Sequence, residues 1–206
     1  MVIFVLRHGE TKWNVEKRIQ GKRGSHLNKR GRQQAKHAAK SLRKYAVDLI
    51  IASPTVRTMQ TARIINEPHQ VPIIKDAGFM ERDQGVLEGL TARGILKIIP
   101  DIAHQQKKLG IDWRPPKGET FREVHARAVK NFSRIAKAHV GENVIVVSHG
   151  AFIRTLAHHL HGGTPETVFD RKAPDNAELF EVECKLRGKN VLCRLVGRRR
   201  WISLEF

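Results

Sequence analysis

The sequence predicts an α/β fold of three layers, in which helices cover both faces of a largely parallel central sheet and an antiparallel hairpin follows at the C-terminus. Two short, strongly apolar runs, Val2 to Leu6 and Asn143 to Val147, are typical of strands buried on both faces. Between them, strand-like and helix-like patterns alternate, which favours parallel strands joined by helices. Near the C-terminus apolar and polar residues alternate, as in a strand with one face in water.

Local signals in the first half of the chain place the next elements. The segment from Asn28 to about Tyr45 is expected to be a helix, because its asparagine is a suitable N-cap and its apolar residues share one face. Asp48 to Ala52 is expected to be a buried strand. The dipeptide Ser53–Pro54 then predicts an N-cap and the first position of a helix, with Arg57 in its first turn. Val71 to Ile74 is a third strand candidate, near an edge because it contains proline.

The middle of the chain is less regular. Asp76 to Leu90 has no clean period and carries several glycines, so we expect a loop. Thr91 to Ile99 is weakly helical, and Asp101 to Pro116 matches no clear pattern. A capping-box pattern at Thr120 predicts a helix to about Ala138, before the strand at 143–147.

The C-terminal alternation predicts a hairpin. Phe180 to Leu186 and Val191 to Leu195 are the expected strands, and Arg187 to Asn190 can form a two-residue turn with glycine at its first central position. This register places Cys184 directly opposite Cys193 on the apolar face. We expect both thiols to be reduced and packed as small hydrophobic groups.

Length and composition limit the class of protein. A chain of 206 residues without a recognisable linker is expected to form a single domain over residues 1–206. No apolar run is long enough to span a membrane and no signal peptide is recognisable. With only two cysteines, neither in a metal-binding pattern, we expect a cytoplasmic protein.

The formal net charge of +18 is the unusual feature of the composition. Basic residues are concentrated in Lys12 to Arg32 and in Arg194 to Arg200. Few aromatic residues lie among them for stacking on bases, which argues against nucleic acid as a partner. We favour attraction of anionic substrates into an electropositive cleft, although a solvated, highly soluble surface would explain many of these charges.

Both buried strand candidates are followed by a polar residue, a histidine and a glycine. Arginine, histidine and glycine occupy positions 7–9, and serine, histidine and glycine occupy positions 148–150. Strand ends of an open α/β sheet meet where ligands bind. Arg7 can hold a phosphate through two parallel hydrogen bonds, and the imidazole of His8 can attack phosphorus. One such motif would also fit a solvated basic strand end, but the second, at His149, favours a phosphate site.

Further motifs occur in an order that is characteristic of one protein family. The chain resembles the histidine phosphatase superfamily, in its phosphoglycerate-mutase-like branch. The matching motifs are Arg7 to Thr11, Trp13–Asn14, Gln20–Gly21, Ser53 to Arg57, Glu81 to Gly89 and Val147 to Gly150.

The resemblance implies a phosphoryl-transfer site. Arg7 and Arg57 would neutralise the phosphate oxygens, and His8 would attack phosphorus to give a phosphohistidine. The far ring nitrogen of His8 must then hold a proton and face a carbonyl, such as that of Gly9. His149 would lie across the phosphate as a hydrogen-bond donor.

Other residues complete this expected site. Asn14, the backbone of Gly21 and Gly150 at the start of the next helix would bind phosphate. By resemblance, Glu81 is the general acid and later the base that activates water. The scheme needs no metal and no cofactor.

Nearby residues are expected to support the site. We interpret Asp83 and Glu88 as carboxylates that shape the loop. The segments Pro115 to Thr120 and Asn176–Ala177 also resemble the family and are expected to lie around the substrate.

Some residues depart from the family pattern or suggest other sites. In the loop after Gln20–Gly21, Gly24 and His26 stand where the family usually has aspartate and proline, which leaves the shape of this loop open. His158, His159 and His161 could suggest a metal site, but no carboxylate accompanies them, so we do not favour one.

These observations favour a metal-independent phosphatase that hydrolyses small phosphate monoesters. A phosphoglycerate mutase is one alternative, and a non-catalytic anion-binding or nucleic-acid-binding protein of the same fold is another. Gln84 replaces a tyrosine that contacts substrate in the mutases, whereas Arg82 resembles them. The sequence does not indicate the substrate or the oligomeric state.

Overall fold

The computed structural model describes residues 1–188 and 190–199, which form a six-stranded sheet with helices on both faces. The strands are β1 (Val2–Arg7), β2 (Leu49–Ala52), β3 (Ile73–Lys75), β4 (Val144–Ser148), β5 (Leu179–Arg187) and β6 (Asn190–Arg199). The helices are α1 (Lys12–Val15), α2 (Lys29–Leu42), α3 (Val56–Asn66), α4 (Ala92–Ile98), α5 (Ile102–Leu109), α6 (Phe121–Ala138) and α7 (Gly150–Leu160). Short 3₁₀ turns are η1 (Ala77–Phe79), η2 (Gly85–Leu87), η3 (Gly110–Asp112) and η4 (Pro165–Asp170).

The sheet is largely parallel, with the strand order β3-β2-β4-β1-β5-β6. Parallel pairing joins β3, β2, β4 and β1, whereas β5 pairs antiparallel with both β1 and β6. β3 forms one edge, as its proline-containing segment predicts. The predicted fold class is confirmed.

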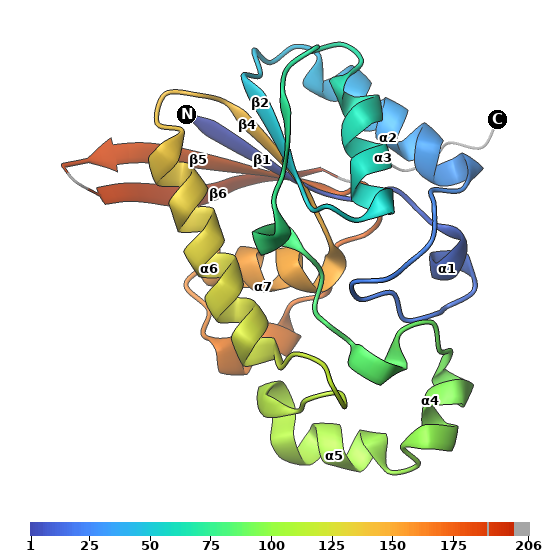
Figure 1. Cartoon of the computed structure of the whole chain (residues 1–206). Coiled ribbons are helices and arrows are strands. Elements are labelled where there is room, and N and C mark those ends of the chain that lie inside the picture. The colour runs from blue at the N-terminus through green and yellow to red at the C-terminus, as the bar shows by residue number, and fades with distance from the viewer. Residues whose placement is uncertain (189, 200–206) are drawn as a thin grey trace.

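Alternation along β1 explains the three layers. Ile3 and Val5 pack into the core beneath α6 and α7, while Phe4 and Leu6 pack into the core beneath α2 and α3. Figure 1 shows these two helix pairs on opposite sides of the sheet. Because β1 is covered on both faces, its residues form the continuous apolar run seen in the sequence.

Pairing of β1 with β4 brings the two histidine motifs together. Arg7 lies opposite Ser148 in this parallel pair, and the backbone N–H of His8 donates to the carbonyl of Ser148 at 3.1 Å. The residues that follow both strands, His8 and His149, therefore emerge side by side at the same edge of the sheet.

The predicted helix starts at Asn28, Thr120 and Gly150 are correct, whereas the one at Ser53 is wrong. Asn28 caps α2 through its side chain, and Thr120 opens α6 with a complete capping box. Ser53 is not an N-cap, because α3 begins only at Val56, after Thr55. The hydroxyl of Ser53 is used elsewhere, in a contact with His149.

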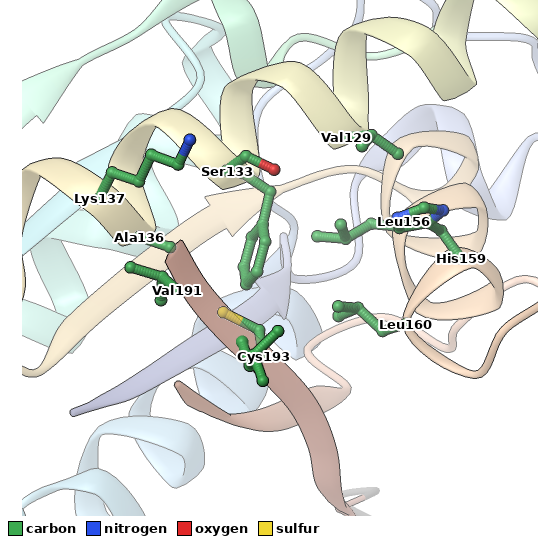
Figure 2. Close-up of a pocket in the computed structure, with 11 residues that line it drawn as sticks. Val129, Ser133, Ala136, Lys137, Leu156, His159, Leu160, Val191 and Cys193 are labelled. Atoms are coloured by element: carbon green, nitrogen blue, oxygen red, sulfur yellow. The ribbon is translucent and has the colours of Figure 1, made fainter. Parts of the chain in front are cut away.

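The hairpin has the predicted register, but the predicted state of its cysteines is wrong. Arg187 pairs with Asn190, and Cys184 pairs with Cys193. The two cysteines form a disulfide; their Cα atoms, directly opposite on one face, are only 4.1 Å apart. Cys193 lines a groove between α6, α7 and β6, where Figure 2 shows its sulfur among apolar side chains. Lys189 of the turn and Arg200 of the basic cluster lie outside the described residues.

Two short helices were not apparent from the sequence. α1 lies within the polar segment from Glu10 to Leu27, whose sequence predicts a long loop. α5 lies within the unassigned stretch 101–116. Neither helix has a buried residue, so neither carries the apolar stripe on which such predictions depend. No helix in the described part of the chain is long and apolar enough to cross a membrane.

Candidate active site

His8 is buried directly after β1, with only 2% of its surface exposed. Its Nδ1 lies 2.8 Å from the carbonyl oxygen of Gly9. Because a carbonyl only accepts hydrogen bonds, Nδ1 carries the proton and Nε2 keeps its lone pair. Nε2 makes no hydrogen bond to any described residue. The ring is therefore held with Nδ1 on the carbonyl of Gly9, the expected partner, and with Nε2 unbonded among the described residues.

Close packing of two glycines fixes the backbone beside this ring. A Cβ on Gly9 would lie 2.4 Å from the carbonyl oxygen of Gly31 at the start of α2, too close for any side chain. The N–H of Gly9 also donates to Thr61 Oγ1 at 3.1 Å. Contacts with α2 and α3 thus place the Gly9 carbonyl that orients His8.

Arg57 extends from the first turn of α3 and is 1% exposed. Its Nη1 donates to the carbonyl of Arg23 at 2.8 Å, and its Nη2 donates to the carbonyl of Gly21 at 2.6 Å. Nη2 also lies 2.9 Å from Nδ1 of His149. Burial is the main cause that lowers the pKa of Arg57, to about 10, so the side chain remains a cation at neutral pH.

Arg7 lies at the end of β1, and its Nη1 donates to the carbonyl of Pro174 at 2.6 Å. The Nε atoms of Arg7 and Arg57 are both buried without a hydrogen-bond partner. Such an unsatisfied donor costs about 1–3 kcal/mol, and more when charged. Two buried guanidinium groups with unused donors are the arrangement expected of an anion site.

His149 uses both of its ring nitrogens within the protein. Arginine can only donate, so Nδ1 accepts from Arg57, and Nε2 therefore carries the proton and donates to Ser53 Oγ at 2.8 Å. The rings of His8 and His149 meet edge to face, with centroids 5.4 Å apart. In this arrangement His149 is neutral and holds Arg57 rather than presenting a donor.

Burial lowers the pKa of both histidines well below the usual value of 6.5. The positive charges of Arg57 and Arg7 act in the same direction. Both imidazoles are consequently neutral at neutral pH, which keeps the lone pair of His8 available.

The remaining predicted phosphate-binding residues lie around these groups. Asn14 accepts hydrogen bonds through Oδ1 from Thr11 and Asn176. Its side-chain nitrogen Nδ2 has no partner among the described residues. Gly150 is the first residue of α7, and a Cβ there would lie 3.5 Å from Cζ of Arg7. The structure thus brings all the predicted phosphate-binding residues to one edge of the sheet.

Glu81 reaches the N-terminus of α7. Its carboxylate accepts hydrogen bonds from the N–H groups of Ala151 at 3.1 and 3.2 Å and of Phe152 at 3.3 Å. Oε1 also accepts from the N–H of Arg82 at 2.9 Å. These contacts fix the Glu81 carboxylate beside the helix that follows His149.

A model of the histidine phosphatase superfamily (branch 1) matches residues 3–195 of the chain. The chain belongs to this superfamily.

Individual relatives and solved structures that are similar to this chain are phosphatases or phosphoglycerate mutases by name. The chain is 31% identical over 198 residues to the uncharacterized phosphatase PhoE of Bacillus subtilis, covering 95% of this chain and 97% of that one. It is 36% identical over 157 residues to the probable phosphoglycerate mutase GpmB of an Enterobacter strain, covering 75% and 72%. A mycobacterial glucosyl-3-phosphoglycerate phosphatase solved with VO3 is 26% identical with a TM-score of 0.83, covering 94% and 96%. This superfamily member is a phosphatase.

Glu88 supports the loop that contains Gly21 in this histidine phosphatase. Its two carboxylate oxygens accept from the N–H groups of Lys22 at 2.8 Å and Arg23 at 3.0 Å. Gly21 has a φ of +55°, which favours glycine, and a Cβ there would lie 2.1 Å from Glu88 Oε1 and displace that carboxylate. Glu88 also shapes its own loop, as expected, because Oε1 accepts from the N–H of Gln84 at 3.3 Å.

Asp83 also holds the loop, because its Oδ2 pairs with Nζ of Lys22 at 2.6 Å and its Oδ1 accepts from the N–H of Gly85 at 2.8 Å. Arg82, an arginine that the chain shares with the mutases, bonds to other segments than the Gly21 loop. It is buried at 4% exposure and donates to the carbonyls of Glu119 and Trp113. Its contacts are thus those of a structural residue.

Three contacts of the site were missed in the sequence. These are the Ser53 hydroxyl on His149, the Thr61 hydroxyl on Gly9 and the Pro174 carbonyl on Arg7. Only Ser53 had a signal, since it follows a buried strand just as His8 and His149 do.

The expected neighbouring segments differ in how they contact the site. Asn176 and Ala177 both donate to the carbonyl of His8, at 3.2 Å each, whereas the carbonyl of Glu119 in the segment 115–120 accepts from Arg82.

The histidines near the end of α7 have other contacts. His158 Nε2 bonds to Thr167 Oγ1 and His161 Nδ1 to the carbonyl of Ala157, both at 2.8 Å. Within residues 1–188 and 190–199, no group of three or more histidine, cysteine, aspartate or glutamate side chains is arranged to hold a metal ion.

Proposed function

We propose that this phosphatase hydrolyses small phosphate monoesters through a phosphohistidine at Nε2 of His8, without a metal ion, and that residues 1–206 act as one catalytic domain. The anchored Nδ1 of His8, 2.8 Å from the Gly9 carbonyl, is the observation that carries the proposal. It leaves Nε2 neutral and free beside two buried arginines.

Binding of the substrate phosphate uses the unsatisfied donors. Arg7 and Arg57 take the equatorial oxygens, with the amide of Asn14 and the loop at Gly21 around them. Gly150, at the start of α7, lies beside the guanidinium of Arg7. Two guanidinium groups supply the positive charge that many other phosphatases take from metal ions.

His149 changes its role when phosphate arrives. The phosphate draws Nη2 of Arg57 away, which frees Nδ1 of His149 beside a dianion. Negative charge at this distance raises the affinity of an imidazole for a proton. Nδ1 then becomes protonated and donates to the transferring phosphoryl group, and Ser53 holds the opposite nitrogen.

Chemistry proceeds in two displacements. In the first, the bond between His8 Nε2 and phosphorus forms while the ester P–O bond breaks, and Glu81 gives a proton to the departing oxygen. In the second, Glu81 takes a proton from water, the water oxygen attacks phosphorus and the P–N bond breaks. Inorganic phosphate leaves and both residues return to their first state.

A phosphoglycerate mutase is the second candidate, because GpmB of Enterobacter is named a probable mutase. Such an enzyme keeps the phosphohistidine away from water and returns the phosphate to substrate. Arg82 donates to the carbonyls of Glu119 and Trp113 and lines a cavity that none of the proposed phosphate-binding residues lines, so it is not placed to hold a second anionic group of the substrate. We therefore favour hydrolysis.

One experiment separates these functions. The enzyme is incubated with 3-phosphoglycerate and catalytic 2,3-bisphosphoglycerate, and with a panel of phosphorylated metabolites, in the presence of EDTA. We expect phosphate release from at least one monoester, unaffected by EDTA, to exceed interconversion to 2-phosphoglycerate. Faster interconversion would establish the mutase, and loss of activity that a divalent ion restores would refute the metal-free scheme.

A further inference from the structure

A cavity of about 320 Å³ lies beside Arg82, the residue that follows Glu81. It is formed where the end of α5, the residues after η3, the start of α6 and η4 meet. Its main lining residues are Arg82, Gln106, Lys107, Trp113, Phe121 and Phe169. None of the proposed phosphate-binding or catalytic residues lines it. Its volume is within the range of sites for small organic ligands, about 300–1,000 Å³.

Arg82 gives the cavity a buried positive charge. Its Nε donates to the carbonyl of Glu119 at 2.7 Å and its Nη2 to the carbonyl of Trp113 at 2.9 Å. Nη1 has no hydrogen-bond partner among the described residues. Burial lowers the pKa of Arg82 to about 10, although Glu119 and Glu81 act in the opposite direction. The guanidinium is therefore a desolvated cation that an anion would stabilise.

Aromatic rings make up most of the other walls. The guanidinium of Arg82 lies 4.3 Å from the centre of the Phe121 ring and 5.5 Å from that of Trp113. Phe121 and Phe169 meet edge to face with centroids 4.9 Å apart, and Phe169 is 46% exposed. Trp113 Nε1 is already bonded to Gln105, so the indole offers its ring rather than its N–H. Such walls favour a planar aromatic group.

The rim adds a second positive charge. Lys107 is exposed at the end of α5 and forms no ion pair with any described residue. No acidic side chain lines the cavity. Its aromatic walls and two cations are thus complementary to a ligand that is both aromatic and anionic.

We propose that this cavity is a binding site for a small aromatic carboxylate, with the ring packed against Trp113 and Phe169 and the carboxylate held by Arg82 and Lys107. A neutral aromatic compound would form no ion pair with Arg82 or Lys107. A non-aromatic carboxylate would lose the ring contacts. Both features are therefore needed for affinity.

The test is calorimetric titration of the full chain with naphthalene-2-carboxylate. Inorganic phosphate is present at a concentration that fully inhibits turnover, so that the catalytic site is occupied. We expect binding under these conditions, and affinity at least about tenfold weaker for 2-methylnaphthalene and for cyclohexanecarboxylate. Absence of binding, or displacement of naphthalene-2-carboxylate by phosphate, would overturn the proposal.

Two pairs of variants locate the site. Lys107→Ala and Phe169→Ala should each weaken binding of naphthalene-2-carboxylate by about threefold to tenfold. Lys108→Ala and Leu109→Ala are matched controls, because these exposed neighbours on α5 do not line the cavity. The controls should bind as the unmodified protein does. Unchanged affinity in both Lys107→Ala and Phe169→Ala would show that the ligand binds elsewhere.

Discussion

Nη2 of Arg57 donates to Nδ1 of His149 at 2.9 Å, so one of the two buried arginines is held by the histidine whose ring meets that of His8. This contact fixes the tautomer of His149, because Nδ1 can accept only when Nε2 carries the proton. The same guanidinium also holds the loop at Gly21. Arg57 thus joins the second histidine to the loop through a single buried cation.

Inorganic phosphate should therefore raise the pKa of His149. Without an anion, burial and Arg57 keep that pKa well below 6.5. A bound dianion reverses the local charge, and we expect an upward shift of about one unit or more. Ring ¹⁵N chemical shifts, followed through a pH titration with and without phosphate, would measure it. An unchanged His149 pKa at saturating phosphate would contradict the proposed donor role.

Glu88 should matter for catalysis although it carries no proton in the proposed reaction. Glu88→Gln replaces one acceptor by a donor that faces the N–H groups of Lys22 and Arg23. We expect a loss of about 1–3 kcal/mol in the free energy of unfolding, and a raised KM because the Gly21 loop shifts. Urea titration and steady-state kinetics would measure both. Glu67→Gln, at an exposed position whose side chain makes no hydrogen bond among the described residues, is the control and should change neither.

Glu81→Gln should discriminate between leaving groups. A nitrophenolate departs without a proton, whereas an alkoxide needs one. We expect kcat/KM to fall by about 10²–10⁴ for an alkyl phosphate and much less for 4-nitrophenyl phosphate. Asp83→Asn, which alters the neighbouring loop carboxylate, should affect both substrates alike. Equal losses for the two substrates in Glu81→Gln would show that Glu81 is not the acid.

The free energy of unfolding should decrease at acid pH because of the two buried histidines. In the folded protein the pKa values of His8 and His149 are well below 6.5, whereas in the unfolded chain they return to about 6.5. The unfolded state then binds more protons as the pH drops below about 6.5, so the free energy of unfolding decreases there. His8→Asn should weaken this pH dependence, as denaturant titrations between pH 5 and pH 7 would show. An identical slope in both proteins would contradict the burial argument.

The architecture of the site could be predicted from sequence because it depends on local patterns. The apolar run of β1 and that of β4 predict two buried strands, and the register between Arg7 and Ser148 then brings His8 and His149 to one edge. The cap at Asn28 and the capping box at Thr120 are equally local signals. The two strands and the two helix caps depend on residues close together in the chain, whereas the register of β1 with β4 joins distant residues.

The contacts that were missed depend on residues far apart in the chain. The hydroxyl of Ser53 reaches His149, so it could not be recognised from the Ser–Pro dipeptide, which predicts an N-cap instead. α5 is only eight residues long and has no fully buried residue, so its signal in the sequence is weak. Cys184 and Cys193 were placed in register correctly, but register does not determine whether opposite thiols bond.

The central claim is that the phosphoryl group passes through Nε2 of His8. Reaction with a ³²P-labelled monoester, quenched within milliseconds and digested under alkaline conditions, tests it most directly. We predict an acid-labile, base-stable label on the peptide that contains His8, formed and lost at rates that account for turnover, and absent in His8→Ala. Full turnover by His8→Ala, or label on another residue, would contradict the account.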